Sequence, residues 1–158
     1  MPNEPEQLVT ARNGQYQLGS LPKRNHPVKY MYIQDLTPYI YLNREPDGKV
    51  LAVGWLDAEH EFIKGALPKG VLERFIALCF KPINQTRGFH PSPFLKSVSL
   101  GYPVEHHGQK MLLGSAEIRV SGLEGKCYAA PNLIYHYMKD CDYLPPQEFL
   151  DALMNNMK

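Results

Sequence analysis

The sequence predicts a single α+β domain in which an antiparallel sheet, partly a β-meander, packs with about three helices, the last two near the C-terminus. β-branched and aromatic runs separated by turn residues predict the strands, which fall within 28–56 and 98–131. Apolar residues at helical spacing over 67–80 and after residue 131 predict the helices. At 158 residues, the chain is long enough to bury a core without disulfides or metals.

The chain is expected to begin with an arm and to continue as one domain. Residues 1–27 are rich in Pro, Asn, Gln and Gly and have no sustained periodicity, which is typical of a flexible or loosely packed segment. From residue 28 the chain becomes aromatic and β-branched. We therefore expect an arm over 1–27 and a single α+β domain over 28–158.

Three short strands are expected in the first half of the domain. Turn residues interrupt the apolar runs: Asp35, Thr37 and Pro38 first, then the Asp47-Gly48 pair, which suits positions with positive φ. The expected strands are 28–34, 39–43 and 50–56. Consecutive strands joined by turns predict a β-meander.

Three helices and a further set of strands complete the prediction. Val71, Phe75 and Ile76 lie on one face of a helix over 67–80, which Pro82 ends. Strands are then expected around a polar tip at 105–109 and a turn at 121–126, over 98–104, 110–120 and 127–131. The last two helices are expected over 132–140, with Pro131 in the first turn, and from the Pro145-Pro146 pair onward.

Composition argues against several classes of partner. A net charge of +1 creates no field that would attract nucleic acid or an anionic membrane. The start of the chain lacks the pattern of a secretory signal, and no apolar stretch reaches the roughly 18 residues of a membrane helix. The three cysteines form no CxxC pair, which favours reduced thiols. We therefore expect a soluble cytoplasmic protein that binds neither nucleic acid nor a membrane, with its oligomeric state left open.

Five motifs in a fixed order resemble a family of small, uncharacterised bacterial proteins. Their patterns are GWLDxxHxF, RGFH, GxxEIxV, YxAPxLIxHY and YxPPxEF, and here they begin at Gly54, Arg87, Gly114, Tyr128 and Tyr143. The resemblance covers about residues 50 to 153. It implies two cysteines after His90 and a histidine at 141, whereas this chain has Ser92, Leu95 and Cys141. Serine is a poor zinc ligand and leucine is none, so we expect neither a metal nor a cofactor.

Three residues are weak candidates for catalysis. Glu117 on a strand and His136 on the following helix would face one another if the hairpin packs on that helix, and a carboxylate beside an imidazole is the beginning of acid–base chemistry. His90 is the third candidate. A structural hydrogen bond between strand and helix is the favoured interpretation of the Glu117–His136 pair. A zinc site built from His90, His136, Cys79 and Cys141 is the less favoured alternative to buried thiols and a loop-bracing histidine.

The remaining candidates are residues that could contact a protein partner. They are aromatic or polar groups on expected loops and helix faces: Trp55, Asp57, His60, Phe89, His90, Phe94, Tyr135 and Tyr143. For Trp55, a place in the core is the favoured reading. The first hypothesis is an immunity-type binding protein that neutralises a toxin or effector by direct occlusion. The alternative is a small metal-dependent enzyme, or its inactive descendant, that uses His90, Glu117 and His136.

Overall fold

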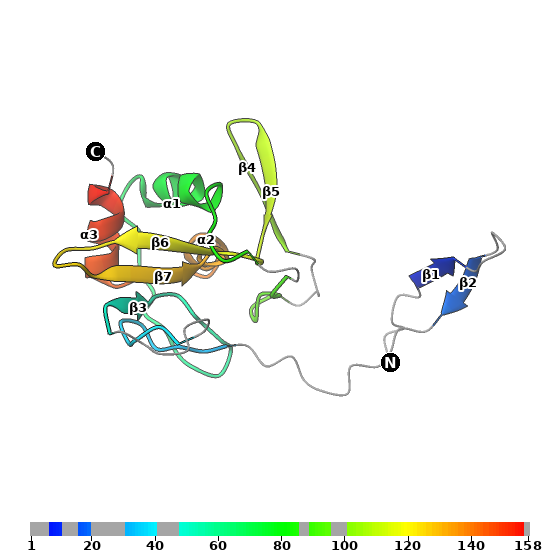
Figure 1. Ribbon diagram of the computed structural model, residues 1–158, viewed down its shortest axis with the longest axis horizontal. Coiled ribbons are helices and arrows are strands. Elements are labelled where there is room, and N and C mark those ends of the chain that lie inside the picture. The colour runs from blue at the N-terminus through cyan, green and yellow to red at the C-terminus, as the bar shows by residue number, and fades with distance from the viewer. Residues whose placement is uncertain are drawn as a thin grey trace.

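The computed structural model describes residues 7–10, 16–19, 31–40, 48–85, 89–95 and 101–156 (Figure 1). It confirms the α+β class, with three helices of which two are C-terminal. The strands are β1 (Gln7–Thr10), β2 (Tyr16–Gly19), β3 (Val50–Ala52), β4 (Tyr102–His106), β5 (Gln109–Leu113), β6 (Glu117–Ser121) and β7 (Cys127–Pro131). The helices are α1 (Val71–Cys79), α2 (Ile134–Asp140) and α3 (Gln147–Asn155).

The central sheet has the strand order β3-β7-β6 and is mixed. β6 and β7 form an antiparallel pair, joined by the turn expected at 121–126, while β3 pairs with β7 in parallel. Isolated bridges extend the sheet on both sides, because Ile83 pairs with Glu117 of β6 and Pro38 with Leu51 of β3. The sheet thus joins a strand of the first half to strands of the last third.

The described residues contain part of the β-meander expected in the first half, because Ile33 and Pro38 form antiparallel bridges with Trp55 and Leu51. Within 31–40 the chain makes only isolated bridges, since Leu36 has a positive φ of 63° and Pro38 has no N–H to donate. The strand expected over 50–56 ends at Ala52, before Gly54 turns the backbone with φ 76°. The rest of the two strands expected at 28–34 and 39–43 lies outside the described residues.

The hairpin β4–β5 forms around the expected polar tip. His107 and Gly108 both have positive φ, as a tight two-residue turn requires. The strand expected over 110–120 is instead divided, because Gly114 adopts φ 119° and its N–H leaves the ladder to donate to Asn132 Oδ1 at 2.8 Å. β5 therefore belongs to the hairpin, and β6 belongs to the central sheet.

Pro131 ends β7 and does not begin α2, which corrects the expectation from sequence. It lies opposite Glu117, whose N–H and C=O both pair with Ile83 on the other side of β6. The missing N–H of Pro131 therefore costs no ladder hydrogen bond at this position. The other two helices, α1 and α3, begin and end within or next to their expected ranges.

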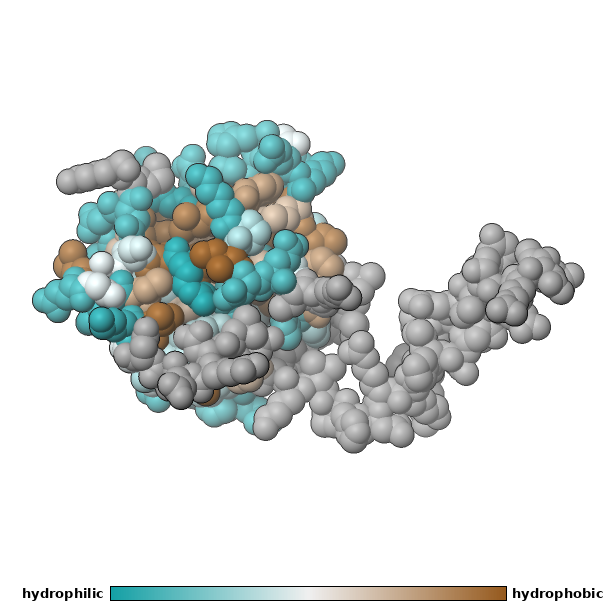
Figure 2. Space-filling view, viewed as in Figure 1, coloured by the Kyte–Doolittle hydropathy of each residue, from teal (hydrophilic) through white to brown (hydrophobic). Residues whose placement is uncertain are grey.

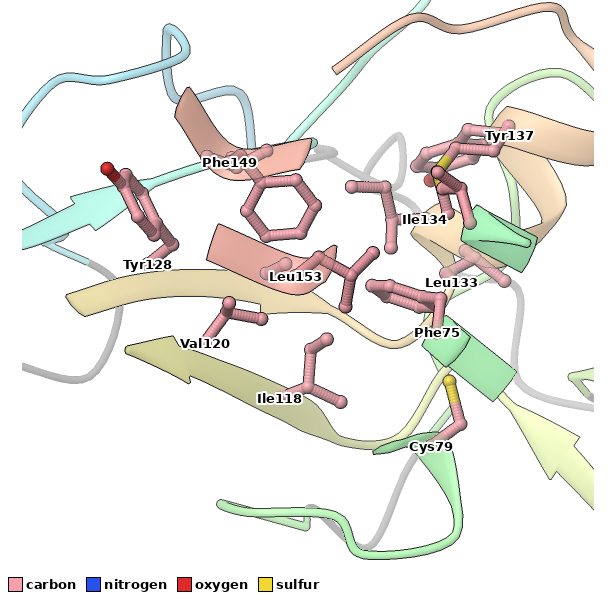
Figure 3. Packing of buried hydrophobic residues seen from close by; sticks show 14 of the residues in the cluster. Phe75, Cys79, Ile118, Val120, Tyr128, Leu133, Ile134, Tyr137, Phe149 and Leu153 are labelled. Carbon is pink, nitrogen blue, oxygen red and sulfur yellow. The ribbon is translucent and has the colours of Figure 1, made fainter. Parts of the chain in front are cut away.

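The three helices and the central sheet enclose the main hydrophobic core. Phe75 of α1 and Phe149 and Leu153 of α3 lie over Ile118 and Val120 of β6 (Figure 3). A second, smaller cluster lies on the opposite face of the sheet and contains Ile33, Tyr39, Ala52, Trp55 and Ala129. Side chains alternate between the two faces of a strand, so Glu117 and Arg119 point to the side of Tyr39.

On the face shown in Figure 2, hydrophilic side chains surround smaller hydrophobic patches. Exposed hydrophobic side chains include Met31, Phe89 and Leu123. Within the described residues, every helix is too short or too polar to serve as a membrane span.

Candidate functional site

A pocket lies where β6 begins and β7 ends, beside the carboxylate of Glu117. The centre of a water-sized sphere can occupy about 60 Å³ of it. Most of the lining is apolar, and it includes Met31, Trp55, Asn84, His90, Glu117 and Leu133. We call this hollow the Glu117 pocket.

Glu117 is buried and held by three side chains. Its Oε1 accepts a hydrogen bond from the hydroxyl of Tyr39, and its Oε2 accepts from Asn84 Nδ2 at 3.0 Å and from Arg119 Nη1 at 2.8 Å. The guanidinium of Arg119 also lies 4.8 Å from the centre of the Tyr39 ring. Burial, and then the hydrogen bond to Glu117, raise the pKa of Tyr39 well above its usual value. The tyrosine therefore stays protonated and acts as a donor.

Glu117 and His136 do not face one another, which overturns the pairing expected from sequence. The imidazole of His136 lies instead between a loop and its own helix. Its Nε2 is 2.9 Å from Ser92 Oγ, and its Nδ1 is 2.9 Å from Asp140 Oδ2. The backbone N–H of Phe94 donates to Ser92 Oγ at 3.2 Å. The carboxylate of Asp140 accepts the Nδ1–H of His136, so Nε2 of the neutral ring accepts the hydroxyl proton of Ser92.

The order Ser92–His136–Asp140 has the connectivity of a serine hydrolase triad, but its burial runs the other way. In a working triad the serine is reachable and the carboxylate is buried. Here Ser92 is 5% exposed, whereas the side chain of Asp140 is 42% exposed. This chain of hydrogen bonds therefore fastens the 89–95 loop to α2 and does not present a nucleophile.

Asp140 receives a further hydrogen bond from the hydroxyl of Tyr102, at 2.7 Å from Oδ2. Burial would raise the pKa of Asp140, but the hydrogen bonds from Tyr102 and His136 outweigh it and lower the pKa below the usual value. The ring of Tyr102 also lies against His136, with 4.5 Å between centroids. Asp140, the solvent-exposed end of this series of hydrogen bonds, is thus tied to the β4–β5 hairpin as well as to α2.

Sequence reasoning missed this connection because Ser92 is distant from α2 in the chain. The spacing of four residues between His136 and Asp140 was a usable local signal, since such residues share one helix face. Nothing in the sequence indicated which residue would meet the other ring nitrogen. His90, the third catalytic candidate, is not part of the Ser92–His136–Asp140 series and lines the Glu117 pocket instead. Its backbone N–H donates to Gly114 O at 2.8 Å.

Two of the partner-binding candidates are structural. Trp55 is 7% exposed and donates from Nε1 to Ala129 O at 3.0 Å, so it belongs to the second cluster while also lining the pocket. Tyr143 is fully buried and donates to Asp35 Oδ2 at 2.7 Å, which removes it from any contact surface. From sequence, Tyr143 was a possible surface contact because tyrosine supplies a large contact area with few rotamers.

The turn after Trp55 holds two further candidates in a local network. Asp57 Oδ1 accepts from the N–H groups of Glu59 and His60, at 3.1 and 2.9 Å, and lies 2.8 Å from His60 Nδ1. Burial would raise the pKa of Asp57, but its bonds to His60 lower it. The imidazole of His60 stacks on Tyr32 with 3.7 Å between centroids, and half of it stays exposed. Asp57 is thus a turn cap, and His60 remains available to a partner.

The last candidates divide between core packing and surface. Phe94 packs edge-on against Phe62 and Tyr137 and is half-buried. Tyr135 is half-buried, with Lys139 5.8 Å from its ring centre. Phe89 is 39% exposed and lies next to Gly114, a lining residue of the pocket, and the exposed Met31 is itself part of the lining.

The zinc site considered from sequence is not assembled. Cys79 is buried in the main core, where burial raises the pKa of its thiol to about 12, and His136 is engaged by Ser92 and Asp140. In the described part of the chain, no three side chains of His, Cys, Asp or Glu gather closely enough to hold a metal ion. Serine at 92 contributes a hydrogen bond where the family resemblance implied a thiolate.

Comparison with known proteins gives a family and no activity. A family model described as a domain of unknown function (DUF7919) matches residues 31–154. No significant match was found among curated proteins or among solved structures.

Proposed function

This chain belongs to the DUF7919 family of domains of unknown function, and from its own geometry we propose that it is a binding protein that neutralises a partner by direct occlusion. The observation that supports the proposal is the Glu117 pocket, an apolar hollow with the exposed side chains of Met31 and Phe89 nearby. Exposed hydrophobic groups around a pocket are typical of sites that receive a partner's anchor residue.

The groups that could perform chemistry are engaged with one another, which favours binding over catalysis. Glu117 is neutralised by Arg119, and Ser92 is buried behind His136. An occluding protein needs a shaped surface and no reactive centre. We further propose that the protein is bacterial and cytoplasmic and that its partner is a toxin or effector, as in immunity proteins. The resemblance in its motifs to small bacterial proteins supports this finer assignment.

Co-expression tests the proposal directly. The chain would be produced in a bacterium together with the product of the adjacent open reading frame, and survival would be scored. We expect protection by the natural chain and weaker protection by Phe89→Ala, because that change removes apolar area beside the pocket. Leu123→Ala is the matched control, since Leu123 is 85% exposed and lies on the β6–β7 turn, away from the pocket. Failure to protect against any adjacent gene product would contradict the immunity assignment.

A second candidate, the inactive descendant of a metal-dependent enzyme, is favoured by one contact. Ser92 Oγ lies 2.9 Å from His136 Nε2, so a thiolate at position 92 would lie beside an imidazole, a ligand pair typical of zinc. Metal analysis of untagged, dialysed protein separates the candidates. We expect no zinc in the natural chain and a gain of zinc in the double variant Ser92→Cys, Leu95→Cys. Stoichiometric zinc in the natural chain would refute a metal-free binder and favour the enzyme.

A further inference from the structure

The spare hydrogen-bonding capacity of the Glu117 pocket is on the acceptor side. A carboxylate oxygen accepts about two hydrogen bonds. Within the described residues, Glu117 Oε1 accepts one, from Tyr39. Asn84 donates from its amide Nδ2 to Glu117. The other amide atom, Asn84 Oδ1, is an acceptor, and this oxygen makes no hydrogen bond with the described residues. A ligand that completes this site must therefore supply a donor.

The charge of the pocket favours a neutral donor over a cation. The carboxylate of Glu117 is already paired with Arg119 at 2.8 Å, and that guanidinium rests on the ring of Tyr39. A second cation would meet a neutralised carboxylate and a nearby like charge while losing its own hydration. A hydroxyl or an N–H of an aromatic ring loses far less on transfer.

The walls favour a flat apolar group. The pocket is lined by apolar side chains, among them Trp55, Leu133, Met31, Pro91 and Pro131. The Nε1 of Trp55 is used by Ala129 O, so this indole offers its ring and not its donor. Aromatic side chains bury a large area at low entropic cost and are enriched among anchor residues.

We propose that the Glu117 pocket receives an aromatic side chain bearing one hydrogen-bond donor, a tyrosine or tryptophan of the partner, with its donor directed at Glu117 Oε1 and Asn84 Oδ1. This inference rests on the proposed function, because it names the chemistry of the anchor that the occluding protein recognises. The chemistry of this anchor can be tested without the partner, whereas occlusion cannot.

Side-chain analogues test the proposal on the intact chain. Trp55 is the single tryptophan of the protein and lines the pocket, so its fluorescence reports occupancy. The probes are p-cresol, 4-methylanisole, which has the same ring but no donor, and methylguanidinium as the cation. We expect p-cresol to bind about tenfold more tightly than 4-methylanisole, as a hydrogen bond to a charged acceptor implies, and methylguanidinium to bind more weakly than p-cresol.

A pair of neighbouring variants tests the acceptors. Asn84 has a positive φ of 51°, so Asn84→Gly removes its side chain without adding backbone strain. Gln85→Gly is the matched control, because Gln85 is an exposed amide next in the chain that does not line the pocket. We expect Asn84→Gly to reduce the preference for p-cresol over 4-methylanisole to about threefold or less, and Gln85→Gly to leave it unchanged.

The outcomes separate this inference from the proposed function. Equal binding of p-cresol and 4-methylanisole, or tighter binding of methylguanidinium, would overturn the anchor chemistry even if co-expression protects cells. The expected preference together with a failure to protect would support the pocket chemistry and contradict the immunity assignment.

Discussion

The hydroxyl of Ser92 joins two segments that are far apart in the sequence, the 89–95 loop and α2. It accepts from Phe94 N and donates to His136 Nε2 at 2.9 Å, in surroundings that are almost fully buried. A buried donor or acceptor that loses its partner costs free energy, whereas an exposed one is compensated by water. Ser92 is thus the residue on which the position of the loop depends.

We expect Ser92→Ala to lower the free energy of unfolding by about 1–2 kcal/mol, because His136 Nε2 and Phe94 N would both lose a partner. Urea unfolding followed by circular dichroism measures the change. The control is Ser121→Ala, an exposed serine at the end of β6, with an expected change within about 0.5 kcal/mol. A Ser92→Ala protein as stable as the natural chain would argue that the hydroxyl serves chemistry and not structure.

Asp140, which ends the series of hydrogen bonds that Ser92 begins, makes stability depend on pH. Burial would raise its pKa, but the bonds from Tyr102 and His136 hold it below 3.8. Between the folded and unfolded pKa values the folded state therefore binds fewer protons than the unfolded state, so stability falls as pH falls through 3.8 and below. Urea midpoints at several pH values should show a shallower acid loss for Asp140→Asn. An identical acid limb in the variant would contradict this assignment.

At the residue scale, the sequence indicated which side chains matter better than it indicated their partners. Glu117 and His136 were singled out because a charged group and an imidazole stand in apolar segments, and both are indeed buried and hydrogen-bonded. Their partners, Tyr39 and Ser92, come from segments that only the tertiary fold brings near. Residue type and burial follow from local pattern, whereas pairing between distant segments does not.

At the element scale, Gly54 sets how closely the end of β3 approaches α2. A Cβ at Gly54 would lie 2.3 Å from Cδ1 of the buried Ile134, and the residue also has φ 76°. Gly48 has a nearly equal φ of 72° but nothing within 4 Å of an added Cβ. The two glycines therefore have nearly the same φ and differ in the space available to an added Cβ.

We expect Gly54→Ala to cost about 3 kcal/mol of unfolding free energy, from backbone strain and a clash that a fully buried isoleucine cannot relieve. Gly48→Ala should cost only about 1 kcal/mol, the strain alone. Chemical denaturation of both variants gives the difference directly. Similar losses in the two would show that packing between β3 and α2 is looser than the structure indicates.

The helices and the last hairpin of the central sheet were predictable because their signals are local. Apolar spacing and prolines fix α1 and α3 within a few residues, and the turn at 121–126 fixes β6 and β7. The parallel pairing of β3 with β7 was not predictable, because it joins residues about 77 positions apart in the chain, as Val50 opposite Cys127 shows. Strand periodicity indicates which residues are buried but not which strand lies alongside.

At the scale of the whole molecule, the central sheet separates two environments. One face carries the helices and the main core, and the other carries the second cluster with Tyr39 and Trp55, next to which the Glu117 pocket opens. The segment 31–39 covers that second face and contributes Asp35, which accepts from Gly54 N at 2.8 Å and from Tyr143. The pocket thus depends on residues that precede β3 as well as on the last third of the chain.

The arm expected over residues 1–27 can be separated from the domain by truncation. β1 and β2 pair with one another, and in Figure 1 they lie apart from the helices and the central sheet. We expect removal of residues 1–27 to change the free energy of unfolding by less than about 0.5 kcal/mol. Removal through residue 36 should cost several kcal/mol, roughly the sum of the lost burial of Ile33 and the two lost bonds to Asp35. Thermal and urea unfolding of both truncations measure this, and equal losses would place part of the arm within the folded domain.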